Sequence, residues 1–298
     1  KFHTSSPGET GEGEIHSMRL ERLAAAPAVP SGTRLSLFDF NIHKMRDDWP
    51  GWIRFVRDQR LRPPDIVFLQ DVENDAARVE FQTALGEAFG GAWNGAGTDP
   101  EWQTAIVWRK RRFTRATHRA WRGFGGKTCV DDSQDAPAVQ VKLYDTLAKK
   151  WVSLVSLKTP PQVDDSCVWS NVQKVDGSFR DEWAADLCVI GTDANSPDRV
   201  ATGDWASWYR NTVRSTAAQL SASGTLGFCD PVADVCGLDR ARADQHVTLK
   251  GKGRVDFLLL RTAARTAPSV VRQMTLPLGN ASGVKWSDHH SVHAEVAY

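Results

Sequence analysis

The amino-acid sequence predicts a single α/β domain. Segments with the pattern of buried strands alternate along the chain with segments of helical spacing. No internal repeat and no low-complexity linker separates two units, although 298 residues would be long enough for two domains. Hydrophobic residues make up 41% of the chain and charged residues 24%, an ordinary globular composition that excludes a disordered protein. We expect the domain to span residues 31–298, and residues 1–30 to form a flexible arm or to be a cloning remnant.

Each expected element rests on a local pattern. The first helix is predicted from the apolar face that Trp49, Trp52 and Phe55 form, and the second from Asn74, a typical helix N-cap. The strands are short apolar runs bounded by turn residues, and the one over residues 139–143 alternates between apolar and polar side chains. In chain order, the expected elements are strand 35–41, helix 50–61, strand 65–69, helix 74–89, and strands 104–108, 139–143, 151–157, 187–190, 255–260 and 291–296.

The charge balance argues against a general attraction to polyanions, and the apolar runs are too short for a membrane span. The chain has 37 Lys and Arg against 36 Asp and Glu, so its net charge of +1 predicts no general attraction to nucleic acid or to anionic membranes. The longest apolar runs, such as residues 66–69 and 257–260, are far shorter than the roughly 20 residues of a membrane span. An anionic partner would therefore have to meet a local concentration of positive charge.

One such concentration lies in residues 109–127, which hold eight Lys and Arg together with Trp121 and Phe124. Basic and aromatic side chains together suit a nucleic-acid backbone or a phosphorylated headgroup, and Arg111 and Arg112 are the candidates for substrate binding. An exposed hairpin balanced by the nearby acidic residues 131–135 is an equally good interpretation.

Five cysteines are too few for a disulfide scaffold in a chain of this length. Four of them lie in polar loop sequence, and we expect the bridges Cys229–Cys236 and Cys129–Cys167, with Cys188 buried and reduced. The chain begins at Lys1 without a Met or an apolar signal segment, which fits a processed or trimmed chain. The expected location is secreted or exported, and the alternative is a cytosolic protein with five free thiols.

Polar side chains stand at the ends of five expected strands, where sites of open α/β folds collect. Asp71, Asp288 and Asn41 offer the hard oxygen atoms that Mg²⁺ or Ca²⁺ prefers. A carboxylate such as Asp256 commonly orients an imidazole such as His289 for proton transfer. Each residue by itself is more often a turn former or a surface pair, but their number and order favour a site. The residues are Asn41 and His43, Gln70 and Asp71, Asp193 and Asn195, Asp256, and Asp288 and His289.

The segments 40–43, 68–72, 191–195, 254–257 and 287–289 resemble, in sequence and order, the endonuclease/exonuclease/phosphatase superfamily of pancreatic-type DNase and abasic-site endonucleases. The resemblance covers roughly residues 34–298. It implies a four-layered α/β sandwich, with two mixed sheets face to face and helices outside. It also implies an enzyme that hydrolyses phosphate esters with Mg²⁺, Mn²⁺ or Ca²⁺, as a nuclease of DNA or RNA or another phosphodiesterase. We expect the protein to be a monomer. A phosphomonoesterase or a phospholipid phosphodiesterase of the same fold is the alternative.

The resemblance also assigns roles. Asn41 and Asp71 would hold the cation with Asp288 nearby, Asp193 would orient or deprotonate the attacking water, and Asn195 would bind a phosphate oxygen. His289, paired with Asp256, would act on the phosphoryl group or transfer the proton. His43 is expected to contact substrate.

Two residues depart from the family pattern. Asp71 stands where the family has Glu, and its carboxylate is shorter by one C–C bond, about 1.5 Å. Lys158 stands where the family has His, and we expect it to bind a phosphate oxygen as a fixed cation. Because of the shorter Asp71 carboxylate, the metal would sit differently, bind through a water or bind more weakly. A third interpretation follows, a phosphate- or nucleic-acid-binding protein with impaired catalysis.

Overall fold

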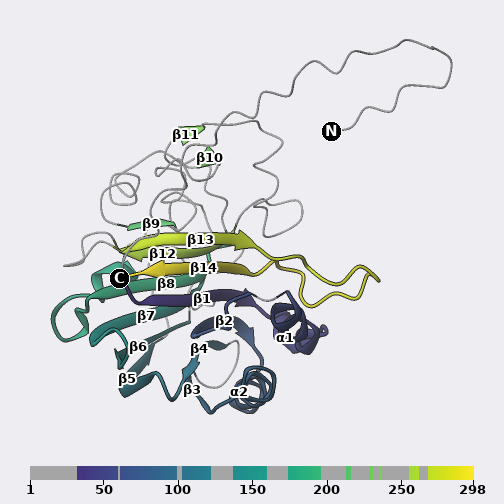
Figure 1. Ribbon diagram of the computed structural model, residues 1–298, viewed down its shortest axis with the longest axis horizontal. Coiled ribbons are helices and arrows are strands. Elements are labelled where there is room, and N and C mark those ends of the chain that lie inside the picture. Colours follow the sequence, from purple (N-terminus) through teal and green to yellow (C-terminus); the bar gives the residue numbers. More distant parts are fainter. Residues whose placement is uncertain are drawn as a thin grey trace, which may run out of the picture.

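The protein is described by a computed structural model, in which two β-sheets pack face to face (Figure 1). The structure describes residues 32–59, 61–98, 103–121, 137–159, 174–195, 213–215, 229–230, 235–236, 255–261 and 268–298. The expected N-terminal arm lies outside these residues, as do Cys129 and Cys167. No helix of the described residues is long and apolar enough to cross a membrane.

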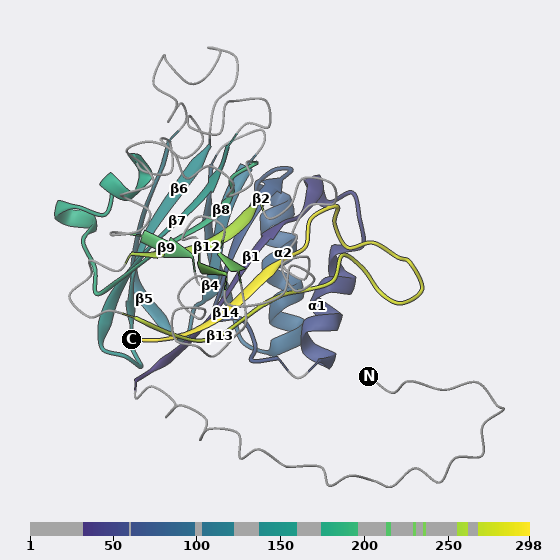
Figure 2. The same ribbon diagram turned by 90° about the horizontal axis from the view of Figure 1, so that it is seen from above.

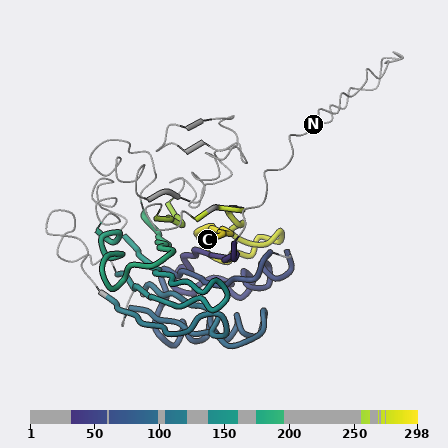
Figure 3. The backbone as a smooth tube through the Cα atoms, turned by 60° about the vertical axis from the view of Figure 1, so that its left-hand side comes forward, coloured from purple at the N-terminus to yellow at the C-terminus, as the bar shows by residue number. Residues whose placement is uncertain are grey.

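The first sheet has six strands in the order β13-β14-β1-β2-β4-β3. Its central strands β1 and β2 are parallel, and the other pairs are antiparallel. Among the described residues, the last strand pairs antiparallel with the first, so the start of one lies beside the end of the other (Figure 3). The strands are β1 (Arg34–Asn41), β2 (Ile66–Val72), β3 (Trp93–Gly97), β4 (Gln103–Arg109), β13 (Ser269–Thr275) and β14 (Val292–Ala297).

The second sheet also has six strands, in the order β5-β6-β7-β8-β12-β9. Here β7 and β8 are the parallel pair. A separate two-stranded ribbon joins β10 (Cys229–Asp230) to β11 (Val235–Cys236). The strands of the sheet are β5 (Phe113–Trp121), β6 (Ala138–Asp145), β7 (Lys150–Lys158), β8 (Leu187–Asp193), β9 (Val213–Ser215) and β12 (Asp256–Arg261).

Two helices cover the outer face of the first sheet, α1 (Trp49–Asp58) and α2 (Asp75–Phe89), side by side in Figure 2. Trp52 of α1 stacks on Phe40 of β1, with ring centroids 4.7 Å apart. The predicted cap is confirmed, since the Asn74 side chain accepts a hydrogen bond from the backbone N–H of Ala77 at 2.9 Å. On the outside of the second sheet lies the segment 174–183, which includes the short helix η2 (Asp181–Trp183), so helical segments flank both sheets.

The predicted strands and helices are all present, within a few residues of the predicted ends. The sequence-based prediction missed β3, β5 and β13, which lie at sheet edges, along with the short strands β9, β10 and β11. The missed edge strands carry weak patterns. β3 contains two glycines, and most side chains of β5 are exposed, so neither shows the buried apolar run of a central strand.

The core between the sheets follows the alternation of the strands. Inward-facing residues such as Leu37, Phe68, Leu154, Val189 and Leu258 are almost completely buried and belong to one cluster. Gly191 of β8 lies in this interface, where a Cβ atom would collide with the Phe68 ring and with the carboxylate of Asp39. The close approach of the two sheets at this point therefore requires glycine.

Replacing Gly191 with alanine should destabilise the protein by about 1–3 kcal/mol, because β8 has to move away from the first sheet. Urea unfolding followed by circular dichroism measures the change. Gly177→Ala is the matched control, since a Cβ atom at Gly177 meets no atom within 4 Å. Equal stabilities of the two variants would contradict the packing assigned to Gly191.

Candidate active site at one end of the sheet interface

At one end of the interface between the sheets, the inward-facing side chains change from apolar to polar. The change occurs on five strands, so the polar side chains meet in one place. Because these positions are closed to water, each polar group there needs a protein partner or a ligand. From the apolar core to the polar end, the inward-facing residues are Leu35, Leu37, Asp39 and Asn41; Ile66, Phe68 and Gln70; Leu154, Ser156 and Lys158; Val189, Gly191 and Asp193; and Leu258 and Asp256.

Asn41 connects two carboxylates of opposite sheets. Its amide nitrogen donates to Asp71 Oδ2 at 3.0 Å and to Asp193 Oδ2 at 2.9 Å. Its amide oxygen accepts a hydrogen bond from the backbone N–H of His43 at 2.9 Å, and its backbone carbonyl accepts one from the Ser287 hydroxyl at 2.6 Å. The side chain is thus held with its nitrogen toward the acidic groups, where it reduces the repulsion between them.

Asp71 reaches this position because β2 is irregular at its end. The register between β2 and β4 shifts between Leu69 and Val72, and Asp71 has a left-handed backbone with φ of 56°. Such a bulge turns the side chain out of the regular alternation. Asp71 Oδ2 accepts hydrogen bonds from Asn41 and from the Lys158 ammonium, whereas Asp71 Oδ1 is buried without a partner.

Asp193 is the most closely held carboxylate of the site. Its Oδ1 accepts from the Asn195 backbone N–H at 3.0 Å, and its Oδ2 accepts from the Asn195 amide at 3.1 Å. Burial, followed by the negative charge of Asp256, raises the pKa of Asp193 to about 6, although His289 and Lys158 oppose the shift. Asp256 lies near because it is the partner of Asp193 in the β12–β8 register.

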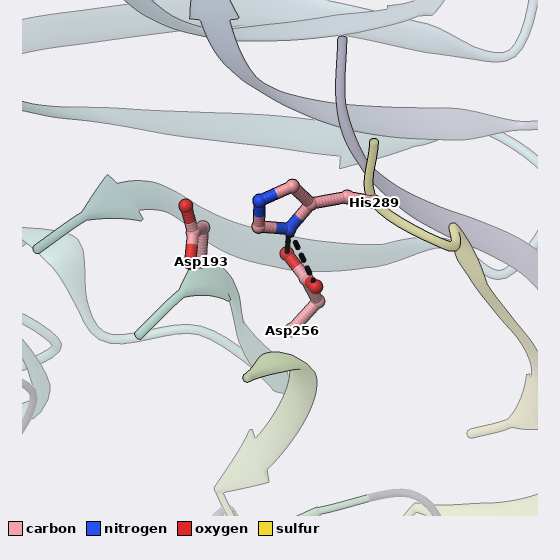
Figure 4. A group of neighbouring side chains, drawn as sticks. All are labelled: Asp193, Asp256 and His289. Carbon is pink, nitrogen blue, oxygen red and sulfur yellow. Dashed lines mark hydrogen bonds and ion pairs between the residues drawn. The ribbon is translucent and has the colours of Figure 1, made fainter. Parts of the chain in front are cut away.

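His289 lies between the two aspartates (Figure 4). Its Nδ1 is 2.9 Å from Asp256 Oδ2 and 3.1 Å from Asp256 Oδ1, and both residues are buried. Burial by itself lowers the pKa of the imidazole, but the charge and hydrogen bond of Asp256, with the charge of Asp193, raise it to about 9. At neutral pH the ring is therefore a cation, held by Asp256 and directed toward Asp193.

Several residues of the site have backbone conformations that are unusual for residues other than glycine. His43, Lys44 and Met45 form a left-handed turn, the short helix η1 (His43–Met45), with φ values of 47°, 55° and 56°. Asn195 has φ of 51°. Conformations of this kind cost free energy and collect at functional sites, where they aim side chains that regular structure cannot.

Comparison with known proteins gives agreement in structure alone. No family model matches the chain, and no curated protein matches its sequence. The endonuclease/exonuclease/phosphatase protein from Bacteroides vulgatus superposes with a TM-score of 0.65, at 14% identity over 89% of this chain and 98% of that one. The chain has the endonuclease/exonuclease/phosphatase fold. The sandwich that the sequence resemblance predicts is thereby confirmed.

Two other structurally similar proteins have names that state a ligand or an activity. D. rerio TDP2 in complex with a single-strand DNA product has a TM-score of 0.60, at 15% identity over 89% of this chain and all of that one. The mannosyl-6-phosphatase Bt3783 of Bacteroides thetaiotaomicron has a TM-score of 0.61, at 11% identity over 89% of this chain and all of that one. Identities this low relate the folds and leave the activity of the present chain open.

His43 and Asp288 lie at the rim of the site. The Nε2 atom of His43 is 3.8 Å from Asp288 Oδ2, and its Nδ1 is 2.9 Å from Asp47 Oδ2. The Asp288 side chain is 43% exposed, unlike the buried aspartates beneath it. The structure thus brings together all predicted site residues of the five strand ends, with these two nearest to solvent.

Arg111 and Arg112 lie away from the site, and the prediction for Arg112 requires a correction. Arg112 is buried, and its guanidinium bonds to Asp145 at 2.6 Å and to Asp65 at 2.7 Å. It also donates to the backbone carbonyl of Arg34, the first residue of β1. The site residue Asn41 is the last residue of the same strand. Arg112 and its neighbour Arg111 are therefore at the opposite end of the sandwich from the site. The predicted role of Arg112 in substrate binding is wrong, because its guanidinium neutralises two buried carboxylates, whereas the role of the exposed Arg111 stays a prediction.

Asp39 is a site residue that the sequence-based prediction left out. It is completely buried beneath Asn41; its Oδ1 accepts from Gln70 Nε2 at 2.8 Å, and its Oδ2 has no hydrogen-bond partner. Burial and the nearby Asp256 raise its pKa well above the usual value. Its position could have been found, because Asp39 stands two residues before Asn41 and so shares the inward face of the strand.

The described residues offer limited ligands to a divalent cation. Asp71 Oδ1 is a buried oxygen atom free to bind one, and Mg²⁺ commonly uses one or two carboxylates together with waters and a phosphate. Asn41 directs its nitrogen rather than its oxygen at this place. Asp193, Asp256 and His289 have ligand atoms within 4.8 Å of one another, but the imidazole, whose pKa is raised to about 9, would have to lose a proton before it could bind a metal.

Replacing Asp256 with asparagine should lower the pKa of His289 from about 9 by at least one unit, because the neutral amide removes the main charge that stabilises the imidazolium. The measurement is an NMR titration of the histidine ring signals in metal-free protein. His293 is the internal control, because burial in the core lowers its pKa to about 3, and its ring stacks on Phe38 and hydrogen-bonds to Ser36, which are not site residues. An unchanged His289 titration would contradict the role assigned to Asp256.

Proposed function

We propose that this protein is a divalent-metal-dependent hydrolase of phosphate esters. One arrangement carries the proposal, the buried His289–Asp256 pair facing Asp193 at the polar end of the sheet interface. It places a proton acceptor and a cationic donor beside each other, and in-line displacement at phosphorus needs both.

Asp193 is the residue that orients and deprotonates the attacking water. A carboxylate with a pKa near 6 is ionised at neutral pH and is a stronger base than an exposed aspartate. Hydrogen bonds from Asn41 and Asn195 hold both of its oxygen atoms, so the carboxylate does not have to reorient during the reaction.

His289 stabilises the negative charge that develops on the phosphoryl oxygen atoms. Its Nδ1 proton is directed at Asp256, which leaves Nε2–H as the donor toward substrate. Asp256 acts through the ring, by fixing its orientation and its protonated state. Lys158 is a further donor at the same end of the sheets, and His43 lies at the rim beside Asp288. The Asn195 amide already donates to Asp193 Oδ2 and to the Thr159 carbonyl, so binding a phosphate oxygen would require one of these hydrogen bonds to break.

The cation fits this arrangement through Asp71, whose Oδ1 atom is free, and through water or a substrate oxygen. When bound, a divalent cation supplies Lewis-acid polarisation of a phosphoryl oxygen. Mg²⁺ and Mn²⁺ suit a site with few protein ligands better than Ca²⁺, which takes six to eight oxygen atoms.

We propose a phosphodiester as the substrate, DNA or RNA in the first place. In support, a DNA product is bound to D. rerio TDP2, which has the same fold. A phosphomonoester is the second candidate, because Bt3783 of the same fold is a mannosyl-6-phosphatase. The loss of Arg112 from the substrate-binding residues removes one argument for nucleic acid, so the choice needs an assay.

The assay compares plasmid DNA, single-stranded DNA, RNA, a small phosphodiester, a phosphomonoester and sphingomyelin, each with Mg²⁺, Mn²⁺ or Ca²⁺. Asp193→Ala and His289→Ala should each lower kcat on the accepted substrate by at least about 10³-fold, because each removes a group needed in the transition state. Asp58→Asn, an exposed residue of α1 paired with Arg57, is the control and should keep full activity.

Retained activity in both alanine variants would overturn the assigned roles. The absence of turnover on every substrate would favour the alternative of a catalytically impaired phosphate- or nucleic-acid-binding protein, which retains the fold and binds these ligands without cleaving them.

We also propose that the protein works outside the cytosol, with a disulfide between Cys229 and Cys236. The backbone of the β10–β11 ribbon supports this bridge, because the two residues are direct partners in an antiparallel register. Such partners have Cα atoms about 4.5–5.5 Å apart, within the range that a disulfide spans. Cys188 is buried, and burial raises the pKa of its thiol to about 11, which suits a reduced and unreactive cysteine.

Mass spectrometry of a digest made without reducing agent should show the peptides of Cys229 and Cys236 joined to each other and Cys188 free. The second predicted bridge, Cys129–Cys167, is read from the same digest. Four alkylatable thiols outside Cys188 in the native protein would contradict both bridges and favour a reducing compartment.

A further inference from the structure

We propose that Lys158 is a built-in counter-ion that competes with the divalent cation for Asp71 and thereby weakens metal binding at the site. This inference rests on the proposed function, because it concerns the cation that the hydrolase would use.

The first observation is the ion pair itself. The ammonium of Lys158 donates to Asp71 Oδ2, and the two side chains are only 18% and 10% exposed. Removing one partner of a pair this shielded from water leaves an uncompensated charge and costs far more than on the surface, where opposite charges gain little. Lys158 is the last residue of β7, so its side chain is aimed at the site by the strand.

The second observation is the uneven hydrogen bonding of the Asp71 carboxylate. Oδ2 accepts from both Lys158 and Asn41, whereas Oδ1 is buried without a partner. If Lys158 replaced the metal altogether, Asp71 Oδ1 would stay buried without any partner, and an unsatisfied buried acceptor costs free energy. The free oxygen instead indicates a carboxylate that is shared between the lysine and a second cation.

The third observation is that a displaced Lys158 has another carboxylate nearby. In the parallel register of β7 and β8, Lys158 is the partner of Asp193. The ammonium can therefore turn from Asp71 toward Asp193 or a bound phosphate without losing all of its charge partners. Competition follows from charge alone, since a divalent cation on Asp71 Oδ1 has to stay close to the ammonium or displace it.

Isothermal titration calorimetry with Mg²⁺ or Mn²⁺ alone, on the full chain stripped of metal, tests the competition. Lys158→Gln keeps a hydrogen-bond donor and removes the charge, and it should lower the Kd of the metal by about tenfold or more. Lys158→Arg keeps the charge and should bind as weakly as the native chain. Asp71→Asn should abolish binding. Lys150→Gln is the matched control, at the opposite end of the same strand, and should leave the Kd unchanged.

An unchanged or higher Kd in Lys158→Gln would overturn the proposal, as would native-like binding by Asp71→Asn. If Lys158→Gln does not fold, Lys158→Met is measured by the rise in Tm on adding Mn²⁺, which should exceed that of the native chain. The outcome is separable from the proposed function. Tighter binding without turnover of any phosphate ester refutes only the function, and turnover with an unchanged Kd refutes only the competition.

Discussion

The close contact of two β-sheets is the constraint on which the rest of this molecule depends. Every inward-facing side chain loses its water, so it has to be apolar or to find a polar partner across the interface. Over most of the length of the sheets the residues are apolar, as with Leu37 and Phe68. At one end Asn41, Lys158 and His289 each bond to a carboxylate, and burial and mutual charge then shift the pKa values there.

The opposite end of the sandwich meets the same constraint without forming a site. There Arg112 joins the carboxylates of Asp65 and Asp145, and the Tyr298 hydroxyl donates to Asp145 at 2.6 Å. Those charges satisfy one another, which is the usual state of buried ionic groups. At the proposed active end, by contrast, Asp71 Oδ1 remains without a partner. The difference between a structural network and a reactive one thus lies in the groups left unsatisfied.

Regular strands could not assemble the site without local exceptions. In a regular strand, the residue after the inward-facing Gln70 would point away from the interface, yet the bulge in β2 turns Asp71 toward Asn41. Asn195 reaches back to Asp193 from a left-handed conformation just after β8. The two sheets form a rigid frame, and a few residues with strained backbones at its end direct their side chains into the site.

The sequence by itself determined the fold class, the succession of the main strands and helices along the chain, and the polar strand ends that include Asn41, Asp193 and His289, because short-range patterns record which residues face a core. Only the tertiary structure decided how these groups pair. It placed Lys158 on Asp71, added Asp39 beneath the site and moved Arg112 to the far end. Contacts of this kind join residues that are distant in the chain. Whether a basic side chain lies near the site depends on which end of the sandwich it occupies, and short-range patterns do not record that.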